Sequence, residues 1–140
     1  MDSFLLDTNV VSEARKAGRA DAGVRAWIAS VRGTQLYLSV LVVGEIRQGV
    51  ERLRRRDPAQ AEMYEAWLAT LLHSYGDRVI PITADVAEEW GRMNVPDPRP
   101  TVDGLMAATA KAKAMTFVTR NTADVDGTGV AVLNPFSRVR

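Results

Sequence analysis

The 140-residue chain has the composition of one globular domain, with 46% hydrophobic and 25% charged residues. It has no cysteine and one histidine, His73, which excludes disulfides, thiolate nucleophiles and zinc sites built on cysteine or on several histidines. A metal would need oxygen ligands, which suit Mg²⁺ or Mn²⁺. The net charge of +1 means that a nucleic acid would have to meet a local basic patch.

No apolar stretch approaches the roughly 20 residues that span a bilayer, and the amino terminus lacks the basic start of a signal peptide. We therefore expect a cytoplasmic protein that does not contact a membrane.

Strand and helix patterns alternate from the amino terminus onward. A short apolar run at 4–6 predicts a buried strand, followed by helices over 10–16 and 21–31. Residues 36–38 predict a second strand, and 39–55 predict a long helix with a capping serine at its first position.

The alternation continues to the carboxyl terminus. The patterns predict three further helices and three further strands, the helices over 57–74, 83–93 and 101–113 and the strands over 79–82, 115–119 and 130–133. Pro81 predicts that its strand ends there or lies at a sheet edge, and three prolines predict a rigid loop over 94–100. The fold expected is a single α/β domain with a mostly parallel central sheet of four to five strands flanked by helices.

Four acidic residues occupy positions from which they can converge. Asp7 and Asp124 follow predicted strands, and Asp103 lies in the first turn of a helix that can begin at the same sheet edge. Glu45 lies beside the apolar stripe of the long helix, where a carboxylate is costly unless it is paired or binds a metal. Clustered carboxylates raise one another's pKa, and a cation would relieve their repulsion.

Each acid also has a simpler explanation. Asp7 is a favoured helix cap, and Asp103 is stabilised by the helix dipole. Glu45 is equally well explained by a salt bridge to Arg47 or Arg92.

Arginines are dense at the end of the long helix, at Arg52, Arg54, Arg55 and Arg56. Cations at a helix carboxyl terminus complement its dipole, which is the interpretation we favour. The alternative is a phosphate-binding patch, and it gains weight if these side chains face the acidic residues.

The chain resembles the PIN-domain family, and within it the VapC-type ribonuclease toxins of bacterial toxin–antitoxin pairs, including the FitB branch. The similarity spans the chain in order and lies in the segments 5–9, 43–50, 102–110, 119–124 and 127–136. Each motif alone is weak, but together, in this order and with this spacing, they are specific.

The resemblance implies an acidic site that holds Mg²⁺ or Mn²⁺, made of Asp7, Glu45, Asp103 and Asp124. It implies that Thr8 and Asn121 support this site by hydrogen bonding. The family usually has an aromatic residue after the last acid, where this chain has Val125, and Asp126 is nearby. The fourth acid is therefore either Asp124 or Asp126.

The implied activity is hydrolysis of RNA phosphodiester bonds, with the metal activating water and neutralising phosphoryl charge. Arg47 and Arg120 are candidates for holding RNA phosphates. The resemblance also implies a homodimer and a cognate VapB-type antitoxin that inserts a segment into the active-site groove, in a heterotetramer or larger assembly. The number of ions and the RNA target stay open.

Three other classes place acids in similar positions. A response-regulator phosphoacceptor domain needs a lysine where this chain has Arg120 and Asn121, and a haloacid-dehalogenase phosphatase needs an aspartate where it has Asn9. The third is a catalytically inactive PIN-like module that binds RNA or protein, which the presence of all four acids disfavours.

Overall fold

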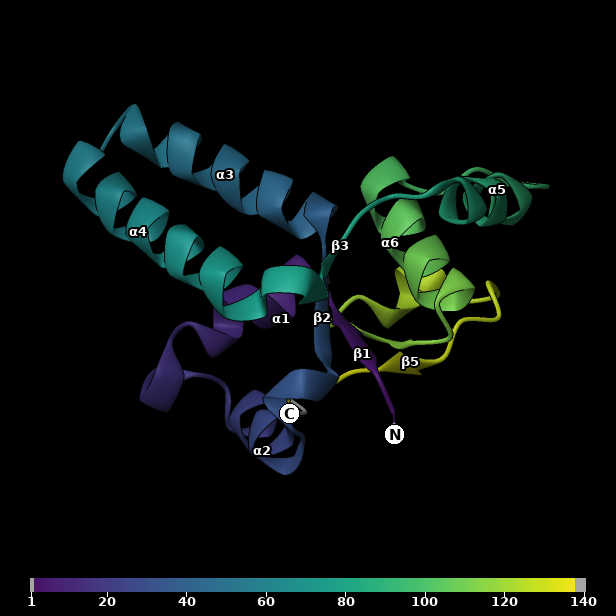
Figure 1. The fold of residues 1–140 in the computed structure, drawn as a ribbon, viewed down its shortest axis with the longest axis horizontal. Helices are drawn as coiled ribbons and strands as arrows, with labels where there is room; N and C mark the ends of the chain where they lie inside the picture. Colours follow the sequence, from purple (N-terminus) through teal and green to yellow (C-terminus); the bar gives the residue numbers. More distant parts are fainter. Residues whose placement is uncertain (1, 138–140) are drawn as a thin grey trace.

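The computed structural model describes residues 2–137 and contains a parallel sheet surrounded by helices (Figure 1). In these residues the sheet has five strands in the order β3-β2-β1-β4-β5, and every pairing is parallel. The strands are β1 (Phe4–Leu6), β2 (Leu36–Ser39), β3 (Val79–Ile80), β4 (Thr116–Val118) and β5 (Val132–Leu133). The helices are α1 (Thr8–Ala14), α2 (Ala22–Ser30), α3 (Val40–Arg54), α4 (Pro58–Tyr75), α5 (Ala84–Met93) and α6 (Thr101–Ala112). The predicted α/β class and the parallel sheet are confirmed.

The two outer strands are shorter than predicted. The strand predicted over 79–82 pairs only at Val79–Ile80, because Pro81 has no N–H to continue the ladder. β3 lies at the edge of the sheet, as Pro81 indicates. The last strand begins only at Val132, after a turn in which Gly127 and Gly129 adopt positive φ.

The core lies on both sides of the central strand β1. Leu5 and Leu6 are essentially inaccessible, as are Phe117 and Val118 of the neighbouring β4. Helix α6 packs beside β4 and is rich in buried alanine, whose small side chain lets the helix approach the sheet closely.

Helices α3 and α4 form an antiparallel pair that projects away from the sheet (Figure 1). Val42, Ile46 and Val50 are the buried face of α3, at the spacing of one helical stripe. The carboxylate of Asp57 accepts a 3.1 Å hydrogen bond from the backbone N–H of Gln60, so Asp57 caps α4.

Ser39 and Thr83 occupy the cap positions of α3 and α5, but only Ser39 caps a backbone N–H. The Ser39 hydroxyl accepts from the backbone N–H of Leu41 at 3.1 Å, as a cap should. Thr83 occupies the cap position of α5, but its hydroxyl donates to the carboxylate of Asp85 and caps no backbone N–H. No helix within residues 2–137 has the length and apolar character needed to cross a membrane.

Candidate active site

Asp7 lies at the carboxyl end of the central strand, where β1 passes into α1. Its backbone N–H still donates to the carbonyl of Val118 at 2.9 Å, which extends the pairing of β1 with β4 by one residue. Its side chain is 5% exposed, and its Oδ1 accepts from the backbone N–H of Thr8 at 2.7 Å. Asp7 is therefore the helix cap that the simpler explanation required, and it is also buried at the edge where parallel strands end.

Thr119 fixes the other carboxylate oxygen of Asp7. Its hydroxyl donates to Asp7 Oδ2 at 2.7 Å, and it is itself buried. The register pairs Leu6 with Val118, so the residues that follow each strand lie side by side. The sequence motif contains Thr119 but gave it no role, because the contact depends on this register.

Glu45 reaches the same region from α3. Its Oε1 accepts a 2.5 Å hydrogen bond from the hydroxyl of Thr8. The salt bridge to Arg47 or Arg92 is not present: Arg47 pairs with carboxylates of α3 and α4, and Arg92 pairs with Glu89. The arginine explanation for Glu45 is therefore wrong, because both cations have closer acidic partners.

Asp103 and Asp124 complete the set from the other side of the sheet. Asp103 is half-buried in the first turn of α6, and Asp124 is exposed in a single 3-10 turn, Thr122–Val125, that follows β4. The backbone N–H of Asp124 donates to the carbonyl of Asn121 at 3.1 Å, which closes that turn.

Burial raises the pKa of Asp7 above its ordinary value. The hydrogen bonds from Thr119 and Thr8 lower this pKa, while the negative charges of Glu45 and Asp124 raise it further. The net direction is upward. The buried carboxylate therefore bears a cost for its charge that its hydrogen bonds only partly offset.

Burial also raises the pKa of Asp103, and the charges of Asp7 and Asp124 add to the effect. Asp124, rather than Asp126, is thus the acid that acts electrostatically on both neighbours. This favours Asp124 as the fourth acid. We call Asp7, Glu45, Asp103 and Asp124 the acidic cluster.

The donor chemistry of the acidic cluster fits a hard divalent cation. All its donors are carboxylate oxygens, and within residues 2–137 none of the four is paired with a lysine or arginine. In the same residues, however, no three acidic or histidine side chains converge closely enough to enclose one ion. The carboxylates are gathered within electrostatic reach, as the sequence suggested, but they do not form a finished coordination cage.

The two predicted supporting residues act in different ways. The Thr8 hydroxyl holds Glu45, as described above. Asn121 contributes through its backbone, because its N–H donates to Thr119 Oγ1 at 3.0 Å and its carbonyl holds the Asp124 turn. No side-chain hydrogen bond of Asn121 is formed within the described part of the chain, so its amide role stays a prediction.

A groove of about 470 Å³ opens between α1, α3 and α4 and includes Thr8 and Glu45. Its other lining residues are mostly apolar, aromatic or basic: Ser12, Arg15, Lys16, Ile46, Gly49, Val50, Leu53, Arg56, Gln60, Tyr64 and Trp67. The Arg15 guanidinium lies 4.2 Å from the centre of the Tyr64 ring and donates to its hydroxyl at 2.7 Å.

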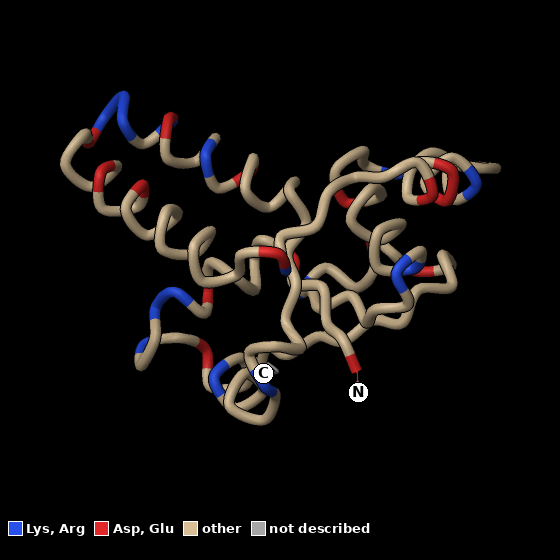
Figure 2. Tube along the Cα trace, viewed as in Figure 1, with Lys and Arg blue, Asp and Glu red and all other residues tan. Residues whose placement is uncertain are grey.

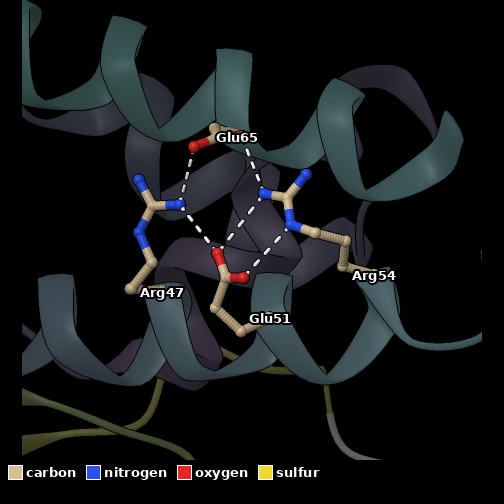
Figure 3. A network of polar contacts seen from close by, with 4 residues as sticks. All are labelled: Arg47, Glu51, Arg54 and Glu65. Atoms are coloured by element: carbon tan, nitrogen blue, oxygen red, sulfur yellow. Dashed lines mark hydrogen bonds and ion pairs between the residues drawn. The ribbon is translucent and has the colours of Figure 1, made fainter. Parts of the chain in front are cut away.

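Four charged side chains bridge α3 and α4, and Figure 3 shows them as a closed network. Arg47 pairs with Glu65 at 2.8 Å and with Glu51 at 3.1 Å. Arg54 pairs with the same two carboxylates, at 2.7 Å and 3.1 Å. Hydrogen bonds from the arginines hold the pKa of both carboxyls below its usual value. We call Arg47, Glu51, Arg54 and Glu65 the α3–α4 ion network.

The arginines at the end of α3 do not share a single role. Basic residues gather where α3 turns into α4 (Figure 2). Arg54 belongs to the α3–α4 ion network, which is a structural role. Arg56 lines the same groove as Glu45, as a phosphate-binding residue would.

The two phosphate candidates are placed differently. Arg47 is engaged by two carboxylates of its own chain, which leaves it poorly available to a phosphate. Arg120 is exposed beyond β4, and its guanidinium lies 4.6 Å from the centre of the Phe136 ring. Both roles stay predictions, and the geometry favours Arg120.

Comparison with known proteins identifies relatives along nearly the whole chain. A family model described as the PIN domain matches residues 4–125. Toxin FitB from Neisseria gonorrhoeae is 31% identical over 138 residues, which cover 95% of this chain and 98% of that protein. VapC ribonuclease Y4jK from Sinorhizobium fredii is 31% identical over 141 residues, covering 95% and 97%.

A solved structure has the same fold at a similar level of identity. The crystal structure of FitAcB from Neisseria gonorrhoeae aligns with a TM-score of 0.85 and 31% identity. The alignment covers 94% of this chain and 97% of that one.

Proposed function

Because the chain belongs to the PIN-domain family, we propose that it is a VapC-type ribonuclease toxin that hydrolyses RNA phosphodiester bonds. The observation that carries the proposal is the acidic cluster, which stands at the sheet edge with no cationic partner within residues 2–137. Two relatives similar over nearly their full length are named a toxin and a VapC ribonuclease. An inactive binding module would have no need to keep together four carboxylates that have no cationic partner within residues 2–137.

We propose that the acidic cluster holds Mg²⁺ or Mn²⁺. Such an ion, when bound, lowers the pKa of water and neutralises charge on the phosphoryl group. The chain's own residues orient the carboxylates: Thr119 and the Thr8 backbone fix the two oxygens of Asp7, and the Thr8 hydroxyl fixes Glu45. Asp7 and Asp103 would be the direct or water-mediated ligands, and Glu45 and Asp124 would complete the shell or orient the attacking water.

The groove between α1, α3 and α4 suits a segment of a cognate VapB-type antitoxin. Its wall is apolar, aromatic and basic, and Glu45 lies within it, so a segment bound there would also block the acidic cluster. This supports inhibition by occlusion. We further propose a homodimer that forms a heterotetramer or a larger complex with the antitoxin.

The test is to map the RNA ends produced by brief expression of three forms: wild type, Asp7→Asn and Asp77→Asn. Asp77 is an exposed acid before β3, at the opposite edge of the sheet, and makes a matched control. We expect new RNA ends with wild type and Asp77→Asn, and none with Asp7→Asn. New ends from Asp7→Asn at the wild-type level would refute the assignment.

A further inference from the structure

Arg99 connects the two segments that carry Asp103 and Asp124. It lies in the proline-rich loop, four residues before Asp103 and just ahead of α6. Its Nη1 donates to the backbone carbonyl of Asp124 at 3.2 Å. Gly127 lies close to the same guanidinium, because a Cβ built on Gly127 would be 3.7 Å from Arg99 Nη2. The guanidinium therefore lies against the loop that follows β4.

The position of Arg99 is itself fixed by its surroundings. Its backbone N–H donates to Asn94 Oδ1 at 2.9 Å, and Asn94 Nδ2 donates to the carbonyl of Trp90 at 3.1 Å. A Cβ on Gly104 would lie 3.7 Å from the Arg99 Cβ and 3.4 Å from the Trp90 ring, so the three residues are packed together. The base of the Arg99 side chain is thus held against α5 and α6.

Charge pairing does not explain why Arg99 points toward the Asp124 turn. Within residues 2–137 it forms no salt bridge, and its Nε is buried without a partner. A second groove, of about 550 Å³, is lined by both Arg99 and Arg92, and Arg92 pairs with Glu89 at 2.8 Å. The Asp124 carbonyl is the acceptor for the Arg99 guanidinium. Because a guanidinium is planar and its donors are rigid, it can hold a carbonyl in a defined direction.

The Asp124 turn needs such a contact. Val125 is buried, and its carbonyl accepts from the Thr128 hydroxyl at 2.6 Å, which anchors the turn one residue after Asp124. The carboxylate of Asp124 stands near two other acids that repel it. The Asp124 N–H is held by the Asn121 carbonyl at 3.1 Å, but that bond lies within the turn and does not fix the turn relative to Asp103.

We propose that Arg99 is a positioning residue of the acidic cluster, which fixes the Asp124 turn relative to Asp103 through the Asp124 carbonyl. The inference rests on the proposed ribonuclease function. Arg99 touches neither substrate nor reacting atoms in this role. It sets the distance between two carboxylates that arrive from separate segments.

The test compares Arg99→Met with Arg92→Met, which removes a cation from the same groove without touching Asp124. We expect Arg99→Met to lower kcat for RNA cleavage by about 10-fold or more, as loss of a partner behind a ligand does, with KM unchanged. Arg99→Lys, which keeps a donor on a long side chain, recovers part of kcat. Equal effects of Arg99→Met and Arg92→Met on kcat would overturn the proposal.

Hydrogen–deuterium exchange provides a readout that does not depend on cleavage. We expect the amides of residues 122–126 to exchange faster in Arg99→Met than in wild type or Arg92→Met. Unchanged exchange would overturn the proposal, and so would faster exchange with a wild-type kcat. If wild type cleaves no RNA, the proposed function fails, while faster exchange in Arg99→Met still supports the tie to Asp124.

Discussion

The acidic cluster and the α3–α4 ion network each contain four charged side chains, arranged in opposite ways. In the α3–α4 ion network two arginines alternate with two glutamates at 2.7–3.1 Å, in contact with solvent (Figure 3). In the acidic cluster all four charges are negative, and Asp7 is buried. One group of charges is paired within the chain, and the other has no cationic partner within residues 2–137.

Folding acts in opposite directions on the charged forms of the two groups. The α3–α4 ion network lowers the pKa of its carboxyls, so its charged form is favoured by folding. Burial and repulsion raise the pKa of Asp7 and Asp103, so their charged forms are opposed by folding. Charges retained against the stability of the fold make the acidic cluster the candidate functional site.

The largest effect is expected when one carboxylate of the acidic cluster is neutralised. Asp103→Asn should lower kcat/KM for RNA cleavage by about 100-fold or more, because a ligand is lost rather than a residue behind it. The measurement is steady-state cleavage of a labelled RNA. Asp77→Asn is the matched control and should keep wild-type kinetics. A loss of kcat/KM of the same size in both variants would contradict a specific role of Asp103 in RNA cleavage.

Thr119→Val should have a smaller effect on the same activity, about 10-fold. The substitution keeps the shape of the side chain but removes the hydroxyl that donates to Asp7 Oδ2 at 2.7 Å. Thr109→Val is the control, because the buried Thr109 hydroxyl donates only to its own helix, at the Leu105 carbonyl. Equal kinetics of the two variants would show that Thr119 does not orient Asp7.

Stability should change in the opposite sense to activity. Without divalent ions at neutral pH, Asp103→Asn should raise the melting temperature by about 2–4 °C, because it removes a charge that burial opposes and that Asp7 and Asp124 repel. Because the pKa of Asp103 is raised in the folded protein, the gain in stability is fully present above that raised pKa. The gain is lost as the pH falls toward 3.8, the ordinary pKa of an aspartate, because the folded and the unfolded wild type then both bind the proton. Thermal unfolding between pH 3.5 and 8 measures it, and a lower melting temperature for Asp103→Asn at pH 7 would contradict the prediction.

The smallest effect is expected in the α3–α4 ion network. Arg47→Met should lower the melting temperature by less than Asp103→Asn raises it, since exposed ion pairs contribute little. The loss should shrink in 1 M salt, where the Debye length is about 3 Å. RNA cleavage by this variant tests the phosphate role of Arg47, and unchanged KM would assign the residue to the fold alone.

Local sequence patterns were sufficient to place the strands and most helix starts, although they made the two outer strands too long. A short apolar run followed by an acid located Asp7, and Asp57 with Pro58 located the start of α4. Both features depend on residues close together in the chain. The convergence of the acids followed from one general rule about parallel sheets.

Features that depend on packing were not predictable from these patterns. Thr119 meets Asp7 because of the β1–β4 register, and Arg47 meets Glu65 because α4 folds back along α3. Arg99 lies in a loop without periodicity, and no local signal points to the Asp124 carbonyl. In each case the partner is distant in sequence, and the sequence contains other residues that could equally well form the same contact.

The most direct measurement is a calorimetric titration of the metal-free protein with Mn²⁺. We expect saturable binding to wild type and Asp77→Asn that is lost in both Asp7→Asn and Asp103→Asn, because divalent charge is what makes four crowded carboxylates tolerable. Identical binding by all four proteins, or no binding by any of them, would contradict it.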